Sequence, residues 1–267
     1  MQAKELVIKA GKELIESGLI ARTWGNISCR ISDTQFVITP SGRAYETLTP
    51  EEIVLVNIED LEYEGEIKPS SEKGIHAACY KLRPEIGFVI HTHQVNASIV
   101  SAIGMDINGI DGENAKVVGD NLPIASYGLP GTKKLRKGVI DAITRSDSKA
   151  AVMAHHGAVC MGVDYDDAFN VAKCVEDICE QFVITKYESL TGTVANGLET
   201  INDYVVDNFV KKPLSAPEFP ACKSERDGSV FNISVIDGDG AITRIDIETG
   251  NIIAGDASNE SIELHRA

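Results

Sequence analysis

The apolar run Gly87–His93 reads Gly-Phe-Val-Ile-His-Thr-His and ends in two histidines separated by one residue. A short apolar run of this kind is typical of a buried β-strand. Side chains two residues apart leave the same face of a strand, so His91 and His93 direct both imidazoles into one pocket. This spacing is typical of a pair of metal ligands, and it requires a fold that buries the strand and opens a pocket at its end.

A second candidate segment is Ser70-Ser71-Glu72, which precedes the helical run Ile75–Tyr80. Helix capping and the helix dipole both favour Ser-Ser-Glu at a helix start, so this motif needs no chemistry to explain it. On that interpretation a serine caps the helix and Glu72 lies in its first turn. The alternative is that Glu72 serves the histidine pair.

A third segment supplies further histidines. Residues 150–154 read as a buried strand that delivers His155 and His156, and we expect residues 158–161 to continue this strand past Gly157.

Elsewhere, helical spacing of apolar residues alternates with short β-type runs. Helices are predicted over residues 3–18, 94–102, 133–143 and 164–190, and further strands over residues 24–31, 35–39 and 53–57. Residues 104–122 are glycine-rich and acidic and carry no assignment. The sequence thus predicts one large domain at 1–200.

The character of the chain changes in the extension 201–267. Residues 201–222 contain three prolines and are predicted to be loop-like, whereas 228–255 read as two or three short strands. Within this small β appendage, the spacing around Asp237, Asp239 and Gly240 fails to match a calcium loop, which ends in a bidentate glutamate.

The charge balance excludes one class of function. A formal net charge of -15 argues against a nucleic-acid or anionic-membrane binder, because such binding requires a basic surface. Backbone amides, hydroxyls and a metal can still form a local phosphate pocket.

The six cysteines are scattered, and no apolar stretch approaches the ~20 residues of a membrane span. We therefore expect a cytoplasmic protein with reduced thiols and no membrane partner.

A single histidine is more often a satisfied core or surface residue than a ligand. Three histidines at strand ends make a His₃ set, the ligand count of catalytic zinc with one position open. Glu72 could complete that shell at rest or act as a base when substrate arrives. Spacing alone leaves both interpretations open, because it does not show spatial closeness.

Five motifs occur in one order along the chain: Gly25-Asn26-Ile27-Ser28, Thr39-Pro40-Ser41-Gly42, Pro69-Ser70-Ser71-Glu72, His91-Thr92-His93 and His155-His156-Gly157. Together they resemble the class II aldolase/adducin family over roughly residues 5 to 190. The set is highly specific for the fold and much less so for the reaction.

The resemblance implies an α/β fold with three layers, in which a central, mainly antiparallel β-sheet is flanked by helices. It implies zinc, or another divalent metal, held by His91, His93 and His156, with Glu72 as acid/base and further ligand. His155 becomes a structural neighbour of the site. The implied phosphate pocket comprises Asn26, Ser41, Gly42, Ser70 and Ser71.

The reaction implied is retro-aldol cleavage of a phosphorylated ketose into dihydroxyacetone phosphate and an aldehyde, through a metal-stabilised enediolate. The resemblance implies that a tyrosine between the histidine pair and the next loop acts as the general acid, but residues 106–121 contain no tyrosine. It also implies a second tyrosine from the carboxy-terminal tail of a neighbouring subunit, for which Tyr204 is only a weak candidate. A dehydratase, epimerase or decarboxylase on the same metal site therefore stays open, as does a non-catalytic adducin-like assembly module. A homotetramer is expected by resemblance only.

Overall fold

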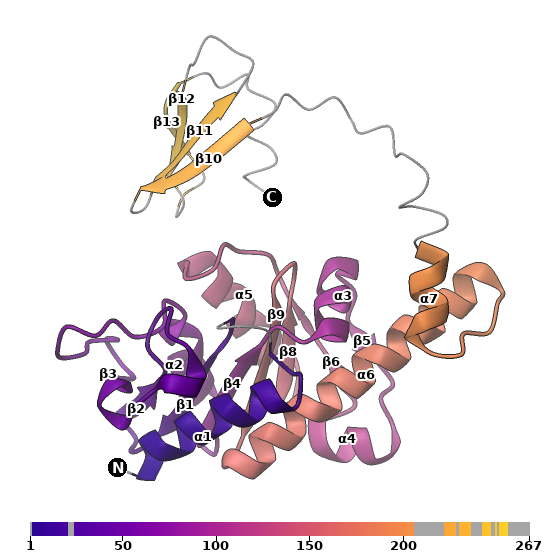
Figure 1. Ribbon diagram of the computed structural model, residues 1–267, viewed down its shortest axis with the longest axis horizontal. Helices are drawn as coiled ribbons and strands as arrows, with labels where there is room; N and C mark the ends of the chain where they lie inside the picture. The colour runs from indigo at the N-terminus through magenta and orange to yellow at the C-terminus, as the bar shows by residue number, and fades with distance from the viewer. Residues whose placement is uncertain are drawn as a thin grey trace. The chain divides into compact units, whose positions relative to one another are not determined.

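The structure is a computed structural model of the 267-residue chain. It describes residues 2–20, 24–205, 222–227, 230–235, 242–246, 249 and 251–255. The chain divides into two compact units, Met1–Val194 and Ala195–Ala267. Figure 1 shows the elements of each unit.

A mixed sheet forms the centre of the first unit, and its described strands lie in the order β3-β2-β1-β4-β9-β8-β7. Neighbouring strands are antiparallel except β7 and β8, which are parallel. The strands are β1 (Asn26–Arg30), β2 (Gln35–Ile38), β3 (Val54–Asn57), β4 (Phe88–Thr92), β7 (Ile124–Ala125), β8 (Ala150–Met153) and β9 (Gly157–Gly162). The predicted mainly antiparallel central sheet is confirmed.

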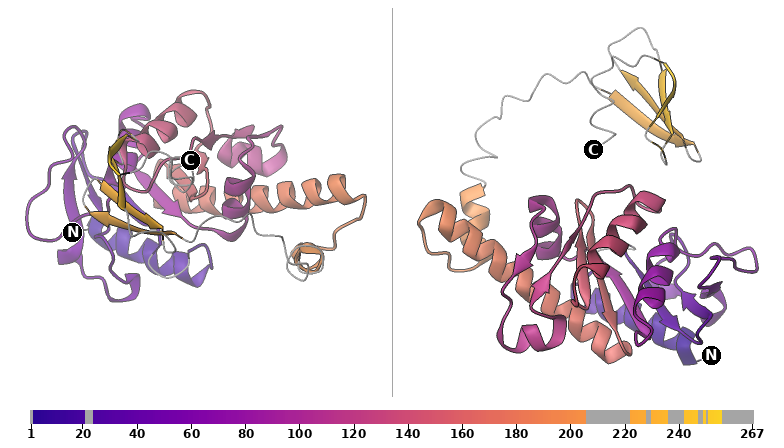
Figure 2. Two further views of the ribbon diagram at one scale, coloured as in Figure 1. Left: turned by 90° about the horizontal axis from the view of Figure 1, so that it is seen from above. Right: turned by 180° about the vertical axis from the view of Figure 1, so that it is seen from behind.

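Helices cover both faces of this sheet (Figures 1 and 2). One face carries α2 (Lys73–Leu82) and α5 (Lys133–Thr144), which contact each other. The other carries α1 (Gln2–Glu16), α3 (Val95–Ile103), α4 (Gly112–Val118) and α6 (Tyr165–Thr191). Helix α2, for example, buries Ile75 and Cys79 in the main hydrophobic core. The result is the expected three-layer arrangement.

Local caps explain where two of the predicted helices begin. The Thr132 side chain accepts a hydrogen bond from the Leu135 amide at the start of α5. At the start of α6, Asp164 Oδ1 accepts one from the Asp167 amide. Each cap satisfies a backbone donor that has no partner inside the helix.

The prediction that the strand at 150–154 continues past Gly157 is wrong. β8 and β9 are separate antiparallel strands, with Met153 paired to Gly157 across a tight turn. His155 adopts a φ of 54°, in the left-handed region that allows the chain to reverse. An added Cβ at Gly157 would lie 2.2 Å from the Thr92 carbonyl oxygen, so this glycine lets β9 approach β4.

The unassigned segment 104–122 forms β5 (Ile107–Asn108), helix α4 and β6 (Asn121–Leu122), and β5 pairs with β6. Short 3₁₀ turns η1 (Tyr45–Thr47) and η2 (Pro50–Glu52) precede β3.

In the second unit, the loop predicted from residue 201 is wrong at its start, because α7 spans Leu198–Val205. The described strands there form a sheet of four rather than two or three. They are β10 (Cys222–Asp227), β11 (Val230–Val235), β12 (Ile242–Asp246) and β13 (Ile252–Ala254). Asp237, Asp239 and Gly240 lie outside the described residues. Among the described residues, no helix combines the length and apolar content needed to cross a membrane.

Candidate active site

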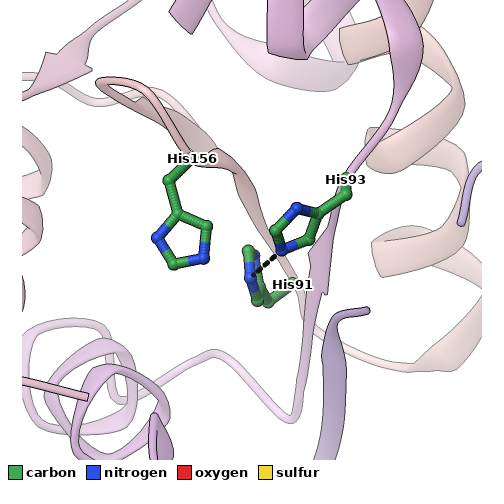
Figure 3. A group of neighbouring side chains, drawn as sticks. All are labelled: His91, His93 and His156. Atoms are coloured by element: carbon green, nitrogen blue, oxygen red, sulfur yellow. Dashed lines mark hydrogen bonds between the residues drawn. The ribbon is translucent and has the colours of Figure 1, made fainter. Parts of the chain in front are cut away.

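Three histidine side chains converge at one end of β4 (Figure 3). His91 lies within β4, His93 directly follows it, and His156 belongs to the turn between β8 and β9. One ring nitrogen of each lies within 4.8 Å of the others. The convergence follows from strand pairing, because β4 pairs with β9 and β9 pairs with β8.

The donor atoms of this cluster are arranged as metal ligands are. His91 Nε2 and His93 Nε2 lie 3.1 Å apart, near the ~3.3 Å that separates two ligands of a tetrahedral ion with bonds of about 2.0–2.1 Å. His91 Nδ1–H donates to the Ala158 carbonyl at 2.8 Å. That bond fixes the tautomer, so the Nε2 lone pair is free for a metal.

The electrostatics keep two of the rings neutral. Burial, together with the nearby His91 and His156, lowers the pKa of His93 to about 3. Burial and His91 likewise lower the pKa of His156 to about 4. Neutral imidazoles present lone pairs at neutral pH, as metal coordination requires.

Glu72 faces these rings from the start of α2. Its Oε2 lies 3.3 Å from His91 Nε2, and its Oε1 lies 3.5 Å from His156 Nε2. Burial by itself raises the pKa of this carboxyl, but His91, His156 and the Asn26 amide outweigh it, and the net shift is downward. The carboxylate is therefore ionised beside the three rings.

The prediction that a serine caps this helix, with Glu72 in its first turn, is wrong. Glu72 occupies the N-cap position of α2 rather than its first turn, and its side chain makes no capping bond. Instead Ser70 Oγ accepts a hydrogen bond from the Glu72 amide at 3.2 Å. Among the described residues, Glu72 Oε1 and His156 Nδ1 are buried with no hydrogen-bond partner. A buried carboxylate oxygen without a hydrogen-bond partner, beside three imidazoles, fits a divalent cation.

A cavity of about 460 Å³ opens on this cluster. It is lined by Glu72, His93 and His156 and by all the residues predicted to bind phosphate: Asn26, Ser41, Gly42, Ser70 and Ser71. A β-bridge between Pro40 and Pro69 holds the two contributing loops together. The structure thus brings segments 40–42 and 69–72 to one wall of the cavity.

Both polar atoms of the Asn26 side-chain amide are already engaged. Its Nδ2 donates to Glu72 Oε2 at 2.9 Å, and its Oδ1 lies 2.5 Å from His76 Nε2.

Sequence reasoning missed several residues of the cavity wall, including Trp24 and Arg43. Arg43 directly follows the Ser41-Gly42 turn, so its place in the sequence could have predicted that it lines the cavity. Its guanidinium pairs with Glu52 at the cavity edge. The Trp24 ring lies 6.0 Å from the His93 ring and is 54% exposed.

His155 lines the same cavity but lies outside the metal cluster. Its ring meets the edge of Tyr127 at 5.8 Å. Tyr45 also lines the cavity, but its hydroxyl donates to the Gly25 carbonyl, and burial raises the pKa of this phenol well above its usual value. Tyr204 lies in α7 of the second unit.

Comparison of the sequence with known proteins identifies the family of this chain. The profile of the class II aldolase and adducin N-terminal domain matches residues 5–183. The chain belongs to the class II aldolase and adducin family. A curated member, 5-methylthioribulose-1-phosphate/5-deoxyribulose-1-phosphate aldolase of Escherichia coli O45:K1, is 37% identical over 179 residues, covering 67% of this chain and 82% of its own.

Members of the class II aldolase and adducin family with other names are similar as well. L-ribulose-5-phosphate 4-epimerase of Salmonella paratyphi A is 29% identical over 220 residues, which cover 78% of this chain and 94% of its own. A solved L-fuculose 1-phosphate aldolase structure matches with a TM-score of 0.66 and 26% identity, covering 78% of this chain and 96% of its own. The proteins similar to this chain therefore include both aldolases and an epimerase.

Proposed function

We propose that this chain is a zinc-dependent aldolase that cleaves a phosphorylated ketose into dihydroxyacetone phosphate and an aldehyde. The observation that carries the proposal is the buried Glu72 carboxylate, whose Oε1 has no hydrogen-bond partner. This carboxylate faces the histidine cluster beside a cavity wall of groups that can donate hydrogen bonds to an anion. Similarity to proteins named as phosphosugar aldolases supports it. Zinc is favoured because three imidazoles with one open position are a usual catalytic ligand set for it.

The phosphate would bind at the wall formed by the two bridged loops. Ser70 Oγ accepts from a backbone amide and keeps its own hydrogen for donation, and the Asn26 amide has a second hydrogen beyond the one given to Glu72. Gly42 adopts a φ of 70°, which is typical of a tight turn that presents backbone amides. These neutral donors suit an acidic chain, because they bind an anion without requiring a basic surface.

Bound zinc would act as a Lewis acid, polarising the substrate carbonyl and stabilising the negative charge that develops when the C3–C4 bond breaks. The phosphate wall orients the ketose so that its reacting carbons lie beside Glu72. In condensation the ionised Glu72 carboxylate removes a proton from C3 of dihydroxyacetone phosphate. In cleavage the C4 hydroxyl gives up its proton as the C3–C4 bond breaks, and Glu72 takes up one proton and delivers it to C3 of the enediolate. Burial excludes bulk water from this transfer.

The runner-up is an epimerase, dehydratase or decarboxylase on the same site. The similarity to an L-ribulose-5-phosphate 4-epimerase favours the first of these, and the lack of a tyrosine in residues 106–121 removes the expected general acid. An adducin-like assembly module is disfavoured, because a scaffold has no use for the buried set of His91, His93, His156 and Glu72.

A substrate panel tests the proposal. Metal-loaded protein is incubated with ketose 1-phosphates and with ketose 5-phosphates, and dihydroxyacetone phosphate is measured by a coupled assay. We expect cleavage of at least one ketose 1-phosphate, its loss on chelation and its return with Zn²⁺. A product that keeps all carbons in one molecule would favour an epimerase or dehydratase, and cleavage that survives complete metal removal would contradict the proposal.

We also propose that the protein is a cytoplasmic homotetramer with its catalytic residues in 1–200 and an extension at 201–267. All the proposed site residues precede Gly157 and lie in the first unit. The α3 helix exposes Val95, Ile99 and Ile103, a stripe at helical spacing that suits contact with another copy.

Sedimentation velocity tests the assembly. We expect the full chain and a chain ending at residue 200 to sediment as the same oligomer, and Ile99→Glu to shift the full chain towards monomer. Ile31→Glu, which changes an exposed isoleucine outside the stripe, is the matched control. A monomeric full chain would contradict the tetramer, and dissociation of only the shortened chain would assign assembly to the extension.

A further inference from the structure

A chain of buried hydrogen bonds runs from Glu72 into the protein core, away from the cavity. Asn26 Nδ2 donates to Glu72 Oε2 at 2.9 Å, and Asn26 Oδ1 lies 2.5 Å from His76 Nε2. His76 Nδ1 lies 2.6 Å from Ser28 Oγ, which lies 2.7 Å from the Tyr80 hydroxyl. The chain therefore joins strand β1 to helix α2 directly behind the proposed base.

The direction of every bond in this chain follows from the carboxylate at its end. A carboxylate only accepts, so Asn26 must present its NH₂ group to Glu72 and its carbonyl oxygen to His76. That oxygen requires a donor, which assigns the proton of His76 to Nε2. Nδ1 must then accept from Ser28.

The last link follows in the same way. The Ser28 hydroxyl hydrogen is given to His76, so its oxygen accepts from Tyr80. All the donors in the chain therefore point towards Glu72.

Burial makes this arrangement rigid. His76 and Ser28 are fully buried, and Tyr80 and Asn26 are 1% and 5% exposed. Burial lowers the pKa of His76 to about 3, so the ring is neutral and has one donor and one acceptor, as the chain requires. A partly satisfied network in the core would be costly, which disfavours the flipped Asn26 amide.

We propose that His76 is a positioning residue for Glu72. Through its Nε2–H it holds the Asn26 amide so that Nδ2, and not Oδ1, faces the carboxylate. A flipped Asn26 would place an oxygen against the ionised Glu72 and push the carboxylate away from the three histidines. The consequence for turnover rests on the proposed function of Glu72, whereas the hydrogen-bond direction does not.

The tautomer of His76 tests the direction independently of any reaction. In full-length protein labelled with ¹⁵N-histidine, two-bond ¹⁵N–¹H correlations distinguish a protonated from an unprotonated ring nitrogen. His76→Gln identifies the signals. We expect His76 as the neutral Nε2–H tautomer at neutral pH. An Nδ1–H tautomer or a doubly protonated ring would overturn the proposal.

Two substitutions of similar size test the positioning. The amide nitrogen of His76→Gln can occupy the place of Nε2 and still donate to Asn26, whereas the shorter side chain of His76→Asn reaches only the place of Nδ1. For metal-loaded enzyme we expect His76→Asn to lower kcat by about 10–100-fold, with KM and metal content nearly unchanged. His76→Gln should recover most of the lost kcat.

Tyr80→Phe is the control for a purely structural effect, because it removes a buried hydroxyl from the far end of the chain and leaves the Ser28–His76–Asn26 links in place. Its kcat should stay near that of the parent. Equal kcat values for the Asn, Gln and parent proteins would overturn the proposal, as would equal losses in the Asn and Gln variants with matched melting temperatures. If His76→Asn fails to fold, the Gln variant and the tautomer still decide.

The two proposals fail in different ways. If the parent protein cleaves no ketose phosphate but His76 is the Nε2–H tautomer, the proposed function fails and the hydrogen-bond direction stands. If Glu72→Gln is inactive while His76→Asn is fully active, the proposed function stands and the positioning role fails.

Discussion

Glu72→Gln should lower kcat by about 10²–10⁴-fold, the usual contribution of a general acid/base. The amide has nearly the shape of the carboxylate but cannot carry the C3 proton. The histidine nitrogens are untouched, so the protein should still bind about one metal ion per chain. Steady-state kinetics with the cleaved ketose phosphate and metal analysis of the same sample provide the two measurements.

The control for this change is Glu113→Gln, which removes a surface carboxylate paired with Lys116 and should leave kcat unaltered. Glu72→Asp is informative as well, because it keeps the charge but draws the carboxylate back from His91 and His156. We expect it to retain more activity than the glutamine variant. Parent-level turnover by Glu72→Gln would remove this residue from the mechanism.

His156→Ala should weaken metal binding by more than about 100-fold, a loss larger than the usual effect of residues that only support a ligand. It leaves His91 and His93 as a pair, with no third imidazole. Because Zn²⁺ binds the folded protein and not the unfolded chain, it raises the melting temperature by mass action. The substitution should therefore abolish most of the Zn²⁺-induced rise seen in the parent.

The neighbouring histidine provides the matched control. His155→Ala should retain the Zn²⁺-induced rise, because His155 lies outside the cluster and its ring packs against Tyr127. Its φ of 54° is unfavourable for alanine, so the apo protein should lose some stability. His155→Asn tolerates this backbone better and separates the two effects. Greater metal loss in His155→Ala than in His156→Ala would show that the other member of the pair is the ligand.

The sequence was sufficient for features set by local physics. The two-residue period of a strand places His91 and His93 on one side, and both lie in the cluster. Helical spacing and caps predicted α5 and α6 to within a few residues, because Thr132 and Asp164 act on backbone amides close in sequence. These features depend on neighbours along the chain.

Prediction failed where two conformations share one pattern. The apolar stretch around Gly157 fits one continuous strand as well as two paired strands. The choice is made by the left-handed backbone at His155 and by the pairing of β9 with β4. The start of α7 and the fourth strand of the second unit were missed for a second reason: short segments carry a weak periodic signal.

By itself the sequence determined the apolar run that buries β4, the spacing of the two histidines at its end and the presence of Glu72 at a helix start. Only the tertiary structure decided that the Glu72 side chain makes no capping bond to α2 and instead faces His91 and His156. It also decided that Asn26, some 50 residues from His76, is held by that ring. The reason is physical: a side chain's partner is selected by which unsatisfied groups folding buries together, and spacing along the chain does not record that.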